Sequence, residues 1–329
     1  MQSAPRVDWG QGPRPFKVLS VTSNKGGVGK TTIACNLAVY IRALREDLPI
    51  LLLTLDDQLV LDRMFSLSDE ESSVGLIQAI RAGDLSPVIK LGQFGVRYVP
   101  ASRDAGALKS TISDLYHLQR VLVQTDWHGL VIIDTKSDFE ILTQNAIAAS
   151  DLIMVAVKDY SSLLEAERVF ELLRSMGRPS DRARIVLSLM DLRVKFKEGP
   201  ADVLELLVSE SRDRGYPLFE SFLSRSAKIE ALQTNPEARV HSIMHGAPTS
   251  VAHRQMTLLA DEVLSLLGIL GNGNGMARSV DESFGVSERG AALRSGDMAR
   301  TTVGFGADRE KKKVLDASRP RREKGEPIS

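Results

Sequence analysis

Residues 23–32 read SNKGGVGKTT, and the types and spacing of these side chains suit the binding of phosphate. The glycines allow the backbone to curl, so that several N–H groups can point at one phosphate group. Lys30 would meet the β- and γ-phosphates of a nucleotide, and the Thr31 hydroxyl would coordinate Mg²⁺. A helix that starts near Gly29 would add the positive end of its dipole. The segment therefore predicts a nucleotide-binding P-loop.

Two acidic side chains stand where apolar runs end. Asp134 follows the apolar residues LVII, and its carboxylate would hold Mg²⁺ through a water molecule. Asp56 follows the run ILLLTL, where a carboxylate is expected to face Mg²⁺ or water beside the phosphate loop. The alternative for Asp56 is an aspartate that caps a turn at the end of a strand.

The elements that must position these residues follow from the hydrophobic pattern. Short apolar runs predict six buried strands, at residues 16–22, 50–55, 95–102, 130–135, 151–157 and 183–191. Helical patterns lie between or after them, at residues 31–46, 161–177, 201–215 and 250–268. This alternation indicates an α/β fold, a doubly wound and mostly parallel sheet with helices on both faces.

Composition divides the chain of 329 residues into three parts. Residues 1–15 carry Pro, Gly and Ser and predict a flexible leader, and residues 16–270 form the nucleotide-binding domain. Residues 271–329 have few large apolar side chains and predict a disordered tail. For its basic end, a solvated tail and weak anchoring to nucleic acid or acidic lipid are both open; the residues are Lys311, Lys312, Lys313, Arg319, Arg321, Arg322 and Lys324.

The overall composition limits the classes of function. Lys+Arg and Asp+Glu both number 42, so that any contact with DNA needs a local basic patch. Cys35 is the only cysteine, which excludes a disulfide within the chain and a Cys-rich metal site. His241 and His245 lack an evident third ligand, which favours a packing or solvent role over a metal site. No apolar run approaches the roughly 18 residues of a membrane-spanning helix, and a cytoplasmic protein is expected.

The phosphate loop departs from the general P-loop pattern, because Asn24 occupies the first glycine slot. KGGVGKTT is the deviant Walker A motif, and residues 16–268 resemble the MinD/ParA family, including its arsenite-transport and nitrogenase-reductase relatives. The resemblance implies a P-loop NTPase fold of the SIMIBI type, the cofactors ATP and Mg²⁺, and slow, partner-stimulated ATP hydrolysis. It assigns ATP binding to Lys25, Gly26, Gly27, Val28, Gly29, Lys30, Thr31 and Thr32.

The resemblance also implies a division of labour among Lys25, Lys30 and Asp56 as the catalytic residues. Lys25 would reach across a homodimer interface to the partner's ATP, much as an arginine finger does. The alternative is a lysine that serves its own phosphates. Asp56 would orient the attacking water, while Thr31 and Asp134 would hold the metal.

Three sites depart from the motifs that relatives commonly carry. After the second strand, Thr54 and Asp57 replace the Asp and Pro of D-x-D-P-Q, and after the fourth, Lys136 and Ser137 stand within D-x-P-P. Ser188 occupies the slot of an adenine-reading Asn. The rate of hydrolysis and the residues that read the base therefore stay open.

Two segments, MDLRVKF and FLSRSAKIEAL, resemble the DNA-contacting segments of chromosome-partition ParA proteins. The matching residues are Arg193 and Arg225, and Lys195, Lys197 and Lys228 lie nearby in sequence. Such side chains would contact DNA phosphates without reading bases. The alternative is a solvated basic face.

The resemblance implies a ParA-like ATPase that is cytoplasmic and associated with the nucleoid. Its ATP-bound homodimer would bind DNA non-specifically and position a cargo, until a ParB-like protein or cargo adaptor triggers hydrolysis. A MinD-like membrane switch is disfavoured, because the tail has few bulky apolar residues. The altered Thr54, Lys136 and Ser137 keep open a weakly or non-hydrolysing scaffold or regulator. Lys25 disfavours a metabolic ligase or kinase, which needs no lysine that bridges subunits.

Overall fold

The computed structural model describes residues 14–56, 60–67, 75–102, 104–191, 193, 195–197, 199–234 and 240–269. These residues all belong to one compact unit, which spans residues 1–285. Most of the predicted leader, Asp57 and the whole predicted tail with its basic residues lie outside the described residues.

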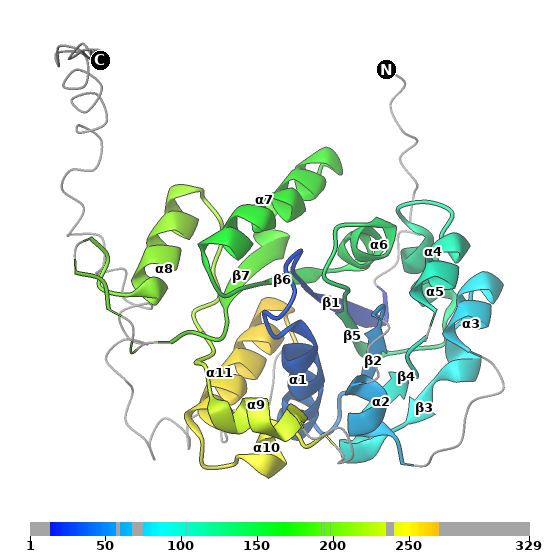
Figure 1. Ribbon diagram of the computed structural model, residues 1–329. Helices are drawn as coiled ribbons and strands as arrows, with labels where there is room; N and C mark the ends of the chain where they lie inside the picture. Colours follow the sequence, from blue (N-terminus) through cyan, green and yellow to red (C-terminus); the bar gives the residue numbers. More distant parts are fainter. Residues whose placement is uncertain are drawn as a thin grey trace, which may run out of the picture. The chain divides into compact units, whose positions relative to one another are not determined.

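The core of the domain is a seven-stranded sheet in the order β3-β4-β2-β5-β1-β6-β7 (Figure 1). All neighbouring strands are parallel except β3 and β4. The strands are β1 Phe16–Thr22, β2 Ile50–Thr54, β3 Lys90–Leu91, β4 Arg97–Val99, β5 Gly129–Asp134, β6 Leu152–Val157 and β7 Ala183–Leu187. The predicted fold class is confirmed, and the sheet gains a short antiparallel edge strand, β3, that the sequence pattern does not predict.

Helices cover both faces of this sheet. Figure 1 shows α6, α7 and α8 on one side of the strands and α1, α9, α10 and α11 on the other. The helices are α1 Lys30–Leu44, α2 Val60–Phe65, α3 Leu76–Ala82, α4 Ala105–Thr111, α5 His117–Gln124, α6 Ile141–Ala149, α7 Tyr160–Ser175, α8 Val203–Asp213, α9 Ala227–Thr234, α10 Ile243–Gly246 and α11 Val251–Leu266. Single 3₁₀ turns lie at Ser86–Val88, Gln93–Gly95 and Ser180–Arg182.

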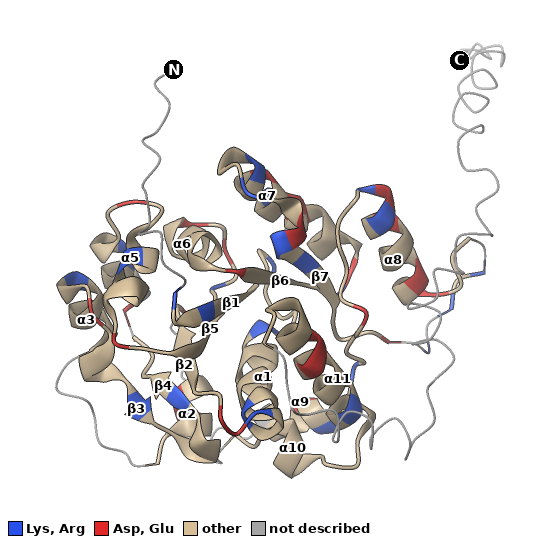
Figure 2. Ribbon diagram, turned by 180° about the vertical axis from the view of Figure 1, so that it is seen from behind, with Lys and Arg blue, Asp and Glu red and all other residues tan. Residues whose placement is uncertain are grey.

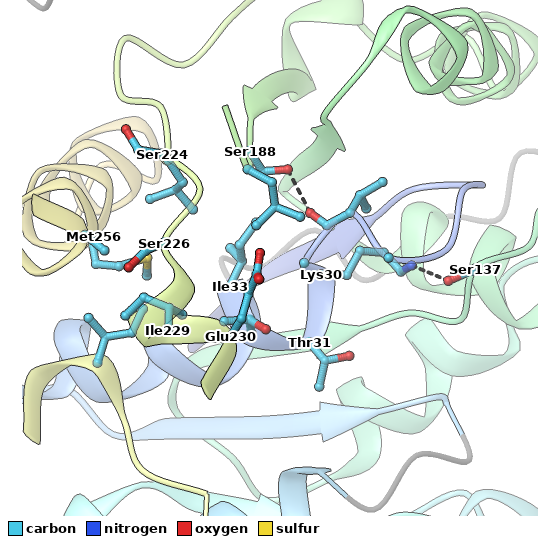
Figure 3. Close-up of a pocket in the computed structure, with 18 of the residues that line it drawn as sticks. Lys30, Thr31, Ile33, Ser137, Ser188, Ser224, Ser226, Ile229, Glu230 and Met256 are labelled. Carbon is cyan, nitrogen blue, oxygen red and sulfur yellow. Dashed lines mark hydrogen bonds between the residues drawn. The ribbon is translucent and has the colours of Figure 1, made fainter. Parts of the chain in front are cut away.

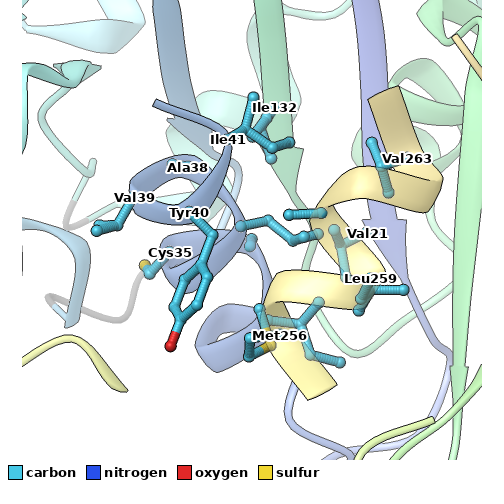
Figure 4. Packing of buried hydrophobic residues seen from close by; sticks show 14 of the residues in the cluster. Val21, Cys35, Ala38, Val39, Tyr40, Ile41, Ile132, Met256, Leu259 and Val263 are labelled. Carbon is cyan, nitrogen blue, oxygen red and sulfur yellow. The ribbon is translucent and has the colours of Figure 1, made fainter. Parts of the chain in front are cut away.

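The first and last helices pack together against the sheet (Figure 4). Ile41 of α1 and Leu259 and Val263 of α11 are fully buried in one apolar cluster with Val21 of β1. Full burial of one such side chain contributes about 1.5–3 kcal/mol. This packing fixes the helix that begins at the phosphate loop.

The strand register brings the predicted acidic residues to one edge of the sheet. Asp134 at the end of β5 lies level with Val21 of β1 and with Thr54 of β2. β7 ends at Leu187, earlier than the predicted 183–191, because Leu189 adopts a left-handed backbone with φ 55°. The carboxyl ends of the parallel strands therefore surround the loop that follows β1, as is usual for ligand sites of such sheets.

Candidate nucleotide-binding site

The loop between β1 and α1 owes its shape to two glycines. Gly27 has φ 65° and Gly29 has φ 88°, both in the left-handed region that residues with a Cβ rarely adopt. Gly29 is the N-cap of α1, and its carbonyl accepts a hydrogen bond from the N–H of Ile33 at 2.9 Å. The glycine spacing of the sequence thus produces the predicted turn from strand into helix.

A cavity of about 470 Å³ opens beside this loop (Figure 3). One end is polar and is lined by the loop, Asp56 and Ser137. The other end is mostly apolar and is lined by Leu189, Leu223, Ile229, Ile243, Ala252 and Met256, together with Ser224, Ser226 and Glu230. A polar end with backbone N–H groups and an apolar end suit a phosphorylated ligand that carries a flat base.

Lys30 carries a buried positive charge at the polar end. The residue is 5% exposed, and its Nζ donates a hydrogen bond to Oγ of Ser137 at 2.5 Å (Figure 3). Burial lowers the pKa of Lys30, and the nearby acids Asp134, Asp56 and Asp138 oppose this effect. Ser137, a departure from the family motif, is therefore a direct partner of the central lysine.

Asp134, at the end of β5, is fully buried. Burial raises the pKa of its carboxyl to about 7, although the hydroxyl of Thr31, the charge of Lys30 and the hydroxyl of Thr54 lower it. Thr54 donates to Oδ2 of Asp134 at 3.3 Å, whereas Oδ1 has no hydrogen-bond partner among the described residues. An orphaned carboxylate oxygen near a threonine hydroxyl is a donor set that fits Mg²⁺.

Thr54 and Asp56 occupy the end of β2 on the same edge. The backbone N–H of Asp56 donates to Oγ1 of Thr54 at 3.2 Å, while Thr54 itself donates to Asp134. Thr54 thus joins the two acidic positions without adding a third negative charge beside a buried carboxyl. Asp56 is half-buried and lines the cavity, and its role in orienting water stays a prediction.

Lys25 lies at the outer side of the loop. Its Nζ forms an ion pair with Asp159 at 2.9 Å, and the side chains are 34% and 39% exposed. Asp159 is also the N-cap of α7 and accepts from the N–H of Ser162. Next to it, Nζ of Lys158 donates to the carbonyl of Gly27 at 3.1 Å. Within one chain, Lys25 is therefore held by Asp159 of the same chain.

Comparisons with known proteins place the chain among related ATPases. A family model described as an AAA domain matches residues 16–178. The virulence plasmid ParA family protein pGP5-D of Chlamydia muridarum is 26% identical over 266 residues, which cover 77% of this chain and 94% of that protein. The chromosome-partitioning ATPase Soj of Thermus thermophilus is 25% identical over 249 residues, which cover 75% and 95%. By these matches the chain is similar to the MinD/ParA family of P-loop ATPases.

The fold comparison points the same way. The structure of the septum site-determining protein MinD from Pyrococcus horikoshii, complexed with Mg-ADP, matches with a TM-score of 0.60 at 19% identity. The match covers 77% of this chain and 98% of that one. The likeness confirms the fold of the MinD/ParA family, a mostly parallel sheet between two helical layers.

Ser188, which occupies the slot where relatives often carry an adenine-reading Asn, contacts the phosphate loop. Its buried hydroxyl donates to the carbonyl of Val28 at 2.7 Å, which ties the end of β7 to the phosphate loop (Figure 3). The polar groups at the apolar end are instead Ser224, Ser226 and Glu230. Sequence reasoning missed them because no spacing signal links residues 222–232 to the phosphate loop.

The predicted DNA-contacting residues Arg193 and Arg225 lie on neighbouring loops, and Lys228 lies in α9. Residues 190 and 224 form a parallel bridge, and the N–H of Arg225 donates to the carbonyl of Met190 at 3.0 Å. Three of the cations pair with an acid: Arg193 with Asp191 at 2.7 Å, Lys195 with Asp202 at 2.7 Å and Arg225 with Glu230 at 2.9 Å. Lys197 and Lys228 are exposed. The bridge between Met190 and Ser224 therefore brings together the loops that carry Arg193 and Arg225.

Surface charge is mixed rather than segregated on the helices beside these loops. Figure 2 shows basic and acidic positions interspersed on α7 and α8. Exposed ion pairs contribute about 0–1 kcal/mol each, so that the paired arginines can still exchange partners.

The remaining sequence candidates have structural surroundings. Cys35 is buried in α1, as predicted, and burial raises its pKa. Nδ1 of His245 lies 2.7 Å from Oγ of Ser242, and its ring stacks on Phe94 at 4.7 Å. Within the part of the chain that the structure describes, no three acidic, His or Cys side chains gather as a metal group. None of the described helices is long and apolar enough to cross a membrane.

Proposed function

We propose that this protein is a ParA-like ATPase that binds ATP and Mg²⁺ in the cavity beside the phosphate loop. The observation that carries the proposal is the buried Lys30, which faces the cavity from a glycine loop at the start of α1. The names of the relatives, a ParA family protein and a chromosome-partitioning ATPase, support the same assignment. Solved relatives of the same fold hold Mg-ADP, which supports these cofactors.

The side chains of the polar end divide the work on the triphosphate. Lys30 binds the β- and γ-phosphates, and the loop N–H groups and the dipole of α1 stabilise their charge. Thr31 and Asp134 would hold Mg²⁺, which would supply positive charge to offset that of the phosphate oxygens. Asp56 orients the attacking water from the end of β2. Asp134 must be ionised for this role, and a cation beside its orphaned oxygen favours that form.

Lys25 supplies the charge that makes assembly depend on the nucleotide. Two ATP molecules that face each other across a homodimer repel, and a lysine from each subunit offsets this repulsion. In the single chain Lys25 is bound to Asp159, so that it has to leave this acid to reach the partner's phosphates. The ATP-bound dimer then displays Arg193 and Arg225 to DNA, and the basic loops contact phosphates without reading bases.

The complete proposal is a positioning cycle in the cytoplasm, on the nucleoid. The ATP-bound dimer binds DNA non-specifically and carries a cellular cargo. A ParB-like protein or a cargo adaptor stimulates hydrolysis, and the monomers leave the DNA. Nucleotide thereby shifts the population between a dimer with high DNA affinity and a monomer with low affinity.

One set of variants tests this cycle by ATP-dependent sedimentation and DNA co-sedimentation. Lys30→Ala should stay monomeric, and Asp56→Ala should accumulate as a DNA-bound dimer because hydrolysis fails. Arg225→Glu should dimerise with ATP but lose DNA. Arg81→Glu is the matched control, because this exposed arginine of α3 undergoes the same charge change away from the predicted DNA surface.

The results separate the proposal from its competitors. Dimerisation and DNA affinity that ignore the nucleotide would exclude the cycle. Dimerisation with no ATP turnover, even with every cellular partner present, would instead favour a nucleotide-dependent scaffold. Equal loss of DNA in Arg225→Glu and Arg81→Glu would move the interface away from the predicted loops.

A further inference from the structure

Glu230 places a carboxylate in the wall of the nucleotide cavity. It belongs to α9, next to Ile229, and lines the end of the cavity that is otherwise mostly apolar (Figure 3). Among the lining residues that the structure describes, Glu230 and Asp56 are the acidic ones, and Asp56 belongs to the phosphate end. A carboxylate at the nucleoside end accepts hydrogen bonds, so that it suits ligand groups that donate them.

The same carboxylate is the partner of a predicted DNA-contacting arginine. Nε of Arg225 donates to Oε1 of Glu230 at 2.9 Å, and the two side chains are 56% and 48% exposed. The backbone of Arg225 is fixed by its bond to the carbonyl of Met190, whereas its side chain lies at the surface. The side chain of Glu230 thus lines the cavity and also contacts the loop that carries Arg225.

A second connection fixes the geometry of this region to the phosphate loop. Ser188 donates to the carbonyl of Val28, and two residues later Met190 accepts from the N–H of Arg225. Leu189 between them lines the cavity in its left-handed conformation. The backbone around Arg225 is therefore held in place, and a change in partner is confined to the exposed side chains.

We propose that the Arg225–Glu230 ion pair couples the nucleotide in the cavity to the binding of DNA phosphates at Arg225. This inference rests on the proposed function. A nucleoside at the apolar end brings hydroxyl and N–H donors to the wall that holds Glu230. As Glu230 accepts from the nucleoside, its bond to Arg225 weakens, and the freed guanidinium turns to a DNA phosphate. Asp191 and Arg193 also face Arg225 and act on it in either state.

The size of this coupling follows from the exposure of the pair, and its reciprocity follows from linkage. An exposed ion pair contributes at most about 1 kcal/mol, which corresponds to about a fivefold change in affinity. Linkage requires that DNA strengthen the binding of nucleotide by the same factor. The coupling acts within one subunit, and it is separate from the larger effect that ATP exerts through dimerisation.

The test measures the affinity of the full chain for a short mixed-sequence DNA duplex by fluorescence anisotropy, without nucleotide and with ADP and Mg²⁺. ADP separates this coupling from ATP-driven dimerisation. Wild type should bind DNA up to about fivefold more tightly with ADP than without it. Glu230→Gln should bind without nucleotide as tightly as wild type does with ADP, and should gain nothing from ADP.

Matched controls isolate the pair. Glu210→Gln breaks the Arg214–Glu210 ion pair on α8 by the same chemical change and should behave as wild type. 2′-Deoxy-ADP and 3′-deoxy-ADP remove ribose donors, and inosine diphosphate removes the amino group of the base. If one of these analogues fails to raise DNA affinity as ADP does, the group that it lacks is the one that donates a hydrogen bond to Glu230.

The outcomes distinguish this inference from the proposed function. If wild type binds DNA with ATP, but Glu230→Gln matches wild type with and without ADP, the coupling is wrong and the positioning ATPase stands. If wild type fails to bind DNA in every nucleotide state, the proposed function and the coupling both fall.

Discussion

Asp134→Asn is expected to stabilise the ligand-free protein at about pH 8, although it removes a residue of the proposed metal site. The folded pKa of Asp134 is about 7 and its ordinary value is 3.8. Between these values the native state binds more protons than the unfolded state, so that stability falls as pH rises through this window. Above it the whole destabilisation persists.

The two pKa values give the size of the effect. The difference is about 3 units, and at about 1.4 kcal/mol per unit the buried negative charge destabilises the native state by roughly 4 kcal/mol. Asparagine avoids this cost, but Lys30 then loses the attraction of its largest acidic neighbour. We therefore expect a net gain of about 2 kcal/mol at about pH 8 and a gain near zero at about pH 4.

Urea unfolding between about pH 4 and 9, without nucleotide and magnesium, measures this difference. Asp181→Asn is the matched control, since this exposed residue undergoes the same chemical change outside the site. With Mg²⁺ and ATP present the order should reverse, because Asp134→Asn cannot hold the metal and loses the stabilisation that ligand binding provides. A ligand-free wild type whose stability rises from about pH 5 to 8, or a variant less stable than it at about pH 8, would refute the reasoning.

Three further substitutions probe the loop and its neighbours. Asp159→Asn keeps a good N-cap for α7 but removes the charge that holds Lys25. ATP-dependent dimerisation should therefore tighten up to about fivefold in sedimentation experiments. Unchanged or weaker association would contradict this prediction. Gly29→Ala places a Cβ at φ 88° and should lower the free energy of unfolding by about 1–2 kcal/mol and weaken nucleotide binding. Ser188→Ala removes the hydrogen bond to the carbonyl of Val28 and should lower the free energy of unfolding by about 1 kcal/mol in denaturant. It should also weaken the binding of a fluorescent ATP analogue. Unchanged nucleotide affinity would show that this bond does not position the phosphate loop.

The elements around the phosphate loop could be predicted because they depend on local patterns. Residues 16–22 form an apolar run that ends at glycines, and the strand ends where that pattern ends. Asp134 could be placed at the same edge because parallel strands have their carboxyl ends together. Buried strands and a loop with fixed glycines leave the backbone few alternatives, so that pattern alone is enough.

Other parts of the site depend on contacts between distant segments. Lys25 and Asp159 meet although 134 residues separate them, and no periodicity in either segment reports the other. The same holds for the hydrogen bond of Lys30 to Ser137 and for that of Ser188 to the carbonyl of Val28. β3 has only two residues and lies at the sheet edge, where too few side chains are present to give a strand pattern. Such features are set by tertiary packing, which a single sequence does not display.

The cavity joins the beginning and the end of the domain, and this has a consequence for biosynthesis. Its phosphate end comes from residues 27–33, whereas Ala252 and Met256 complete its apolar wall on α11. A ribosome that adds about 5–20 residues per second needs roughly 10–45 s to make the intervening roughly 220 residues. During that interval the nascent chain displays the glycine loop without the wall for the base. A complete cavity, with both the glycine loop and the apolar wall, therefore exists only after nearly the whole domain has been synthesised.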